Sequence, residues 1–130
     1  MGLFDFIGGL FNKKPLEEKV EDYAKKGEIG KLHKLADASQ PKETRLLAID
    51  AMRLIKHATA VNFLANEMLR DPDIDIRTQA AKSLLMNGTK DKTDLLLNYS
   101  DEEKEMGNTE LAELLKQAAI DARDRTARVD

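Results

Sequence analysis

The sequence predicts an all-α protein built from a series of short helices. Apolar residues recur at intervals of three and four residues, and no stretch alternates polar and apolar residues as a half-buried strand does. Proline, glycine and aspartate interrupt this pattern at several points along the chain. Helical segments of similar sequence also recur along the chain, which indicates that the fold is built from repeated units.

The first four helices are expected in the N-terminal half. Gly27 separates the first from the second, and Pro41 begins the third, because proline is tolerated in a first helical turn. The segment "DPD" at 71–73 follows the fourth helix. The four predicted ranges are 16–26, 28–38, 41–57 and 59–70.

Three more helices are expected in the C-terminal half. The fifth covers 73–86 and ends at Asn87-Gly88, and the sixth covers 91–99. An acidic linker, "SDEEKEMGN", then leads to a last helix at 108–125.

A shift of the sequence by 32 residues reveals the repeat. Leu32 then falls on Leu64, Arg45 on Arg77, and Ala48 on Ala80. Each unit is therefore a pair of helices with a proline-marked turn, and the first predicted helix resembles half a unit. Because one hairpin cannot bury its apolar stripe alone, such units stack into a solenoid. The lone first helix and the charged last helix are expected to cap its ends.

The segment "DPDIDIRTQAAKSLL" resembles the HEAT-repeat family, including the bacterial variety called phycobilisome-lyase-like HEAT repeats. The second helix of that family follows the pattern D-P-x-x-x-V-R-x-x-A-x-x-A-L. The matching residues here are Asp71, Pro72, Ile76, Arg77, Ala80 and Leu84. The resemblance implies a short right-handed α-solenoid whose second helices line a concave face that binds partners. It also implies that Asp73 or Asp75 forms a structural ladder with Arg45 and Arg77.

The charge balance and the lack of cysteine argue against several classes of function. The chain has 130 residues, 21 Lys and Arg against 24 Asp and Glu, and a net charge of −3, which argues against nucleic-acid binding. It has no cysteine, and therefore no disulfide and no thiolate nucleophile or ligand. We expect a cytoplasmic protein with an N-terminal segment at 1–14 and a repeat domain at 15–130; attachment to the inner face of a membrane is one of three interpretations of the N-terminal segment.

No catalytic, metal-binding or cofactor-binding group is predicted. Asp71, Asp73 and Asp75 alternate as in a calcium loop, but Ile76 and Lys82 stand where that loop needs Gly and Glu. His33 and His57 each lack a second ligand at helical spacing, and His57 is expected near a helix C-terminus. We therefore expect a non-enzymatic scaffold or adaptor that binds another protein. The alternative is a small HEAT-like enzyme or a protein that acts on nucleic acid.

Outward-facing residues of the third and fifth helices form the predicted partner surface. A helical wheel places them opposite the apolar side of each helix. They are Leu46, Asp50, Arg53, Thr78 and Lys82.

The opening stretch "MGLFDFIGGLF" forms an amphipathic pattern that Pro15 separates from the first repeat helix. Its apolar arc consists of Leu3, Phe4, Phe6, Ile7, Leu10 and Phe11. Three interpretations stay open. The segment lies in a membrane interface, with Lys13 and Lys14 near headgroups. It docks in a groove of a partner or of a second copy, which would give self-association. Or it covers the exposed side of the first repeat.

Overall fold

A computed structural model describes residues 15–125, and this part of the chain contains α-helices and short 3₁₀-helices but no strand. The seven α-helices are α2 (Leu16–Lys25), α3 (Ile29–Ala36), α4 (Lys42–Ala51), α5 (Ala58–Asn66), α6 (Ile74–Asn87), α7 (Thr93–Glu105) and α8 (Thr109–Arg125). The 3₁₀-helices are η1 (Met52–Leu54), η2 (Met68–Arg70) and η3 (Lys90–Lys92).

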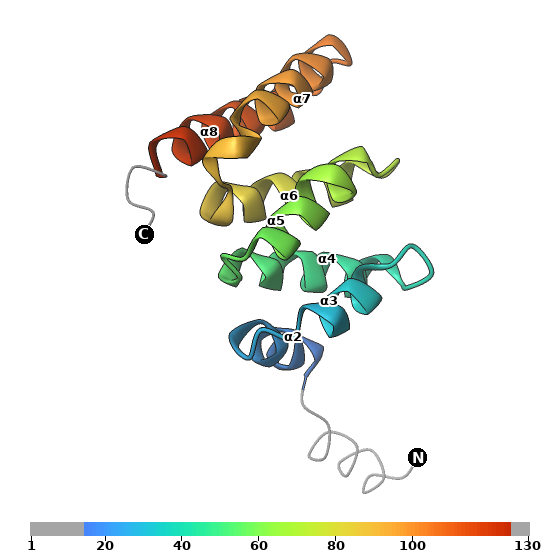
Figure 1. Cartoon of the computed structure of the whole chain (residues 1–130). Helices are drawn as coiled ribbons and strands as arrows, with labels where there is room; N and C mark the ends of the chain where they lie inside the picture. Colours follow the sequence, from blue (N-terminus) through green and yellow to red (C-terminus); the bar gives the residue numbers. More distant parts are fainter. Residues whose placement is uncertain (1–14, 126–130) are drawn as a thin grey trace, which may run out of the picture.

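The helices stack as three hairpins, α3–α4, α5–α6 and α7–α8, with α2 packed against α4 (Figure 1). The chain thus climbs from α2 at one end to α7 and α8 at the other, which confirms the predicted α-solenoid. The second helix of each hairpin also packs against the second helix of the next one. We call α2, α4, α6 and α8 the second-helix layer.

Helices α4 and α6 run in the same direction. Lys42 at the start of α4 bonds to Asp75 at the start of α6 (2.6 Å), and the side chain of Asn87 at the end of α6 bonds to the carbonyl of Met52, just after α4 (2.8 Å). The core between the hairpins is mostly apolar, with a few buried polar and charged side chains. Its largest fully buried aliphatic side chains are Leu32, Ile49, Met52, Leu64, Ile76, Leu84, Leu96 and Leu115.

The first helix forms half a unit, as the repeat predicts. Val20 and Ala24 of α2 are buried, whereas Glu18, Lys19, Lys25 and Lys26 are exposed. The outer side of α2 is therefore polar, and the described end of the solenoid presents charged rather than apolar side chains to solvent.

The third predicted helix is too long. Helix α4 ends at Ala51 and continues as η1, and the backbone is extended at Ile55 (ψ 113°). The side-chain amide of Asn87 donates to the carbonyls of Met52 (2.8 Å) and Ile55 (2.9 Å). In a longer α-helix these two carbonyls would accept backbone N–H groups of later residues. Here Asn87 of the neighbouring hairpin donates to both of them and so stabilises the point where the helix ends.

The predicted acidic linker at 100–108 is wrong, because α7 continues to Glu105. Ser100 and Glu103 point inward: the Ser100 hydroxyl donates to the Ala112 carbonyl (2.7 Å), and Glu103 is only 3% exposed. Gly107, with φ +86°, then makes the turn into α8. The last helix is the second half of a complete third hairpin rather than a separate cap (Figure 1).

Candidate protein-interaction surface

Two arginines link neighbouring hairpins. Arg45 Nη2 lies 2.7 Å from Asp71 Oδ2, and its Nε donates to the carbonyl of Ala36 (2.8 Å). Arg77 Nε lies 2.7 Å from Glu103 Oε2, and its Nη1 donates to the carbonyl of Asp71 (2.9 Å). Each guanidinium thus joins the turn of its own hairpin to a carboxylate of the next hairpin. Arg45, Asp71, Arg77 and Glu103 therefore have a structural role.

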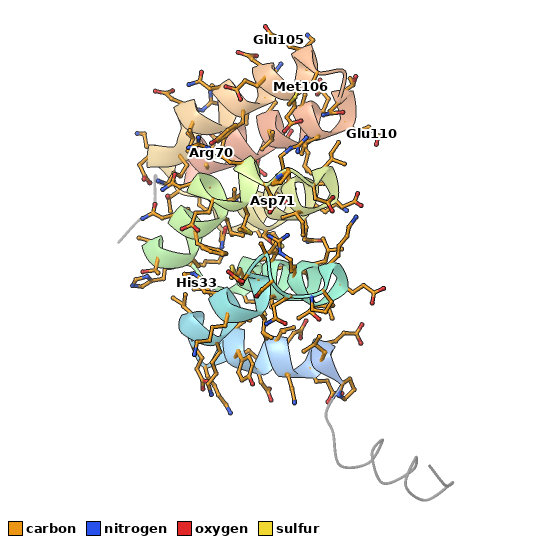
Figure 2. All side chains as sticks on the ribbon, turned by 90° about the vertical axis from the view of Figure 1, so that its right-hand side faces the viewer. His33, Arg70, Asp71, Glu105, Met106 and Glu110 are labelled. Carbon is orange, nitrogen blue, oxygen red and sulfur yellow. The ribbon has the colours of Figure 1, made fainter. Side chains whose placement is uncertain are left out.

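The ladder exists, but its predicted carboxylates are wrong. Asp73 and Asp75 bind Lys42, with Nζ to Oδ2 distances of 3.1 and 2.6 Å. Asp73 also caps α6 by accepting the backbone N–H of Asp75 (2.8 Å), and that bond together with Lys42 lowers the pKa of the Asp73 carboxyl. The carboxylate that reaches Arg45 belongs to Asp71, which lies near the middle of the stack (Figure 2).

Both histidines have structural surroundings. His57 is the N-cap of α5, and its Nδ1 accepts the backbone N–H of Thr59 (3.1 Å); its expected place near a helix C-terminus is wrong. His33 stacks on Phe63 with ring centroids 4.0 Å apart, and burial lowers the pKa of its imidazole. In residues 15–125 no group of three His, Cys, Asp or Glu side chains is arranged to hold a metal ion.

The predicted partner residues all lie on the second-helix layer or its extension in η1. Arg53 Nη1 pairs with Asp50 Oδ2 (2.9 Å), and its Nη2 lies 3.4 Å from Glu21 Oε2 of α2. Gln79 of α6 donates to Asp50 Oδ1 (3.3 Å). Asp50 and Arg53 therefore tie three helices together while remaining half-buried.

A groove opens between α6 and α8, with a volume of about 600 Å³. Helix α6 contributes Ile74, Thr78 and Lys82, and the opposite wall includes Glu110 and Leu114 of α8. Ile74 is 41% exposed, and Lys82 makes no ion pair with any residue from 15 to 125. Figure 2 shows Glu110 at the outer edge of the stack. We call this hollow the α6–α8 groove.

A smaller hollow of about 300 Å³, the α2–α4 groove, lies at the other end of the layer. Its apolar lining comes from Val20 and Leu47. Its carboxylates are Glu17, Glu18, Glu21 and Asp50.

The structure divides the predicted residues between these grooves. Thr78 and Lys82 line the α6–α8 groove, and Asp50 lines the α2–α4 groove, whereas Leu46 and Arg53 line neither. The opposite walls, Glu17 to Glu21 and Glu110 to Leu114, were missed because a wheel of one helix does not show which neighbour borders it. The apolar N-terminal residues from Leu3 to Phe11 lie outside the described residues.

Comparison with known families decides the classification. A family model described as HEAT repeats matches residues 29–122, from the start of α3 into the last turns of α8. The chain belongs to the HEAT-repeat family. The match spans all three hairpins of this HEAT-repeat protein. Members of this family generally bind other proteins.

No curated protein and no solved structure matches this HEAT-repeat chain. Among residues 15–125, no helix is both long and apolar enough to cross a membrane.

Proposed function

We propose that this HEAT-repeat protein is a non-enzymatic scaffold or adaptor that binds another protein through the exposed side of its second-helix layer. One observation carries the proposal: the α6–α8 groove is lined both by the exposed Ile74 side chain and, about two helical turns further along α6, by the ammonium group of Lys82, which has no ion-pair partner in the described chain. A groove that offers both an accessible apolar residue and an unpaired charge suits a protein partner, which can bury the first and pair with the second.

The rival function, an enzyme or a protein that acts on nucleic acid, has less support. The buried charges are engaged in holding hairpins together: Arg45 with Asp71, and Arg77 with Glu103. His33 packs against Phe63. The α2–α4 groove is lined by four carboxylates and no cation, which disfavours a phosphate backbone, and the α6–α8 groove has only one cation, Lys82, opposite one carboxylate, Glu110.

We extend the proposal to the N-terminal segment, for which we propose a membrane surface as the target. Its apolar residues, Leu3 to Phe11, precede Lys13 and Lys14, an order suited to sinking phenylalanine rings below headgroups. The polar outer side of α2 supports this reading, because the first repeat has no apolar end that needs a cover. Co-sedimentation with anionic vesicles tests it: the full chain should pellet and a chain lacking residues 2–14 should not.

The protein-binding proposal is tested by cross-linking capture with matched variants. A double variant, Thr78→Arg with Lys82→Glu, changes the α6–α8 groove, and a control, Asn98→Arg with Lys104→Glu, changes exposed residues of α7. We expect a protein captured by the wild type and the control to be lost with the groove variant, while all three melt at similar temperatures. Equal capture by all three chains would refute the proposed surface.

A further inference from the structure

Helices α6 and α8 run in the same direction and are in close contact at their C-terminal ends (Figure 1). Arg125 at the end of α8 donates to the carbonyls of Leu85 (2.7 Å) and Gly88 (2.6 Å). A Cβ on Gly88 would lie 3.6 Å from the Cβ of Ala122. The residues that line the α6–α8 groove come from the earlier parts of both helices and from the turn before α8. The groove is therefore open where the two helices begin and ends before their close contact.

The close contact also gives the level of each residue along the groove. Ile74 of α6 and Asn108 at the start of α8 lie at the same level, because each precedes its residue of the close contact by 14 positions. From this level Glu110 is two residues further along α8, and Lys82 is eight residues further along α6. The two charged residues are therefore about 9 Å apart along the helix axes.

These two opposite charges have no partner in the described chain. Neither Lys82 nor Glu110 forms an ion pair with any residue from 15 to 125, and both side chains are exposed. Thr78 and the half-buried Leu114 lie at levels between them, and Leu111, which is 3% exposed, also lines the groove. From its open end inward, the groove thus offers an anion, an apolar stretch and a cation.

A helix matches this spacing of charges, whereas an extended chain does not. Helical residues seven positions apart are separated by about 10.5 Å along the axis and lie on the same side of the helix. Extended residues three positions apart are separated by about 10 Å, but their side chains point to opposite faces. In the helix, the residues three and four positions after the first charge lie on the same side, between the two charges. That is the level of Leu114 in the groove.

We propose that the α6–α8 groove binds a helix of another protein that carries an acidic residue, aliphatic residues three and four positions later, and a basic residue seven positions later. The acidic residue pairs with Lys82, the aliphatic residues cover Leu114, and the basic residue pairs with Glu110. An aliphatic residue four positions beyond the basic one covers Ile74. In this order the bound helix is antiparallel to α6 and α8, so its negative C-terminal end lies beside their positive N-terminal ends. This inference rests on the proposed function and names the class of its partner.

The probe is an alanine-based helical peptide with Glu, two Leu, Arg and a further Leu at these positions. A second peptide differs only in having Lys in place of Glu. By fluorescence anisotropy, we expect the full-length wild type to bind the Glu peptide about three- to tenfold more tightly than the Lys peptide. Lys82→Gln should abolish this preference and Lys82→Glu should reverse it. Lys104→Glu, the same charge change at an exposed position of α7, should leave it unchanged.

Three results would overturn the binding of such a helix. The first is equal binding of both peptides by the wild type, or a preference that Lys82→Glu does not change. The second is a wild-type dimer in sedimentation that Lys82→Glu dissociates, because the groove would then bind a second copy. The third is a peptide affinity that rises severalfold when residues 2–14 are removed, because the groove would then bind its own chain. If the two peptides bind equally while the groove double variant still loses its captured protein, the proposed function holds and only the helical partner fails.

Discussion

Asp71 and Arg45, which belong to neighbouring hairpins, form an ion pair with 2.7 Å between Oδ2 and Nη2, and their side chains are only 9% and 10% exposed. Arg77 and Glu103 repeat this pair one hairpin further, again at 2.7 Å. The spacing between partners is 26 residues in both cases. Stacking of successive hairpins therefore depends on a charge contact that recurs with the repeat.

Removal of one partner should be costly. We expect Asp71→Ala to lower the free energy of unfolding by about 3–5 kcal/mol, because it leaves the Arg45 guanidinium buried without its carboxylate. Urea denaturation followed by circular dichroism measures this loss. The double variant Arg45→Met with Asp71→Leu should recover much of it, since no buried charge remains. A loss below about 1 kcal/mol for Asp71→Ala would show that solvent screens the pair.

The helical repeat was predictable from the sequence because it depends on apolar spacing, which the positions of Ala48, Ala80, Leu32 and Leu64 show directly. The ladder partners were not found, although the same 32-residue shift places Asp71 on Glu103. The feature that recurs is a carboxylate, which is an aspartate in one repeat and a glutamate in the next. A search for the Asp-Pro pair therefore does not find Glu103. A search for carboxylates at a constant distance from Arg45 and Arg77 would have found both.

The length of α7 and the grooves were harder to predict. Apolar periodicity ignores Ser100 and Glu103, because they are polar residues at core positions that are stabilised by partners from other elements. The grooves depend on how α2 and α8 sit against their neighbours, which no single helix specifies. Sequence reasoning therefore selected residues of the second-helix layer, such as Thr78, but did not identify the opposite wall of the groove that Thr78 lines.

Asn87 supplies a second polar link between hairpins. Its side-chain nitrogen donates to the carbonyls of Met52 and Ile55 from a position that is 1% exposed. Asn87→Ala should cost about 1–3 kcal/mol, because it removes the side-chain donor to the Ile55 carbonyl, whereas the Met52 carbonyl keeps the backbone N–H of Ile55 (3.0 Å). Asn87→Asp should cost more, since it turns a donor into an anion that faces two carbonyls. Thermal and urea unfolding of both variants check this order, and an aspartate variant as stable as wild type would contradict it.

Two glycines should respond oppositely to alanine. A Cβ on Gly88 would lie 2.7 Å from the carbonyl oxygen of Leu84, so Gly88→Ala should destabilise the protein by about 1–3 kcal/mol. Gly30 lies in α3, where a Cβ meets nothing within 4 Å, so Gly30→Ala should stabilise it by about 0.4–1 kcal/mol. Melting temperatures of the two variants should move in opposite directions, and a stabilising Gly88→Ala would disprove the close contact.

The imidazole of His33 should make stability depend on pH. Burial against Phe63 lowers its pKa below the usual 6.5, while the charge of Glu67 opposes this shift. Between that lowered pKa and 6.5 the unfolded chain binds more protons, so the free energy of unfolding falls as pH decreases through this interval. His33→Phe should flatten this part of the pH profile when urea midpoints are compared from pH 7.5 to 5. The measurement belongs in a His57→Asn background, which removes the other imidazole and keeps a capping acceptor for α5. An unchanged slope in the His33 variant would assign the pH dependence to the carboxylates instead.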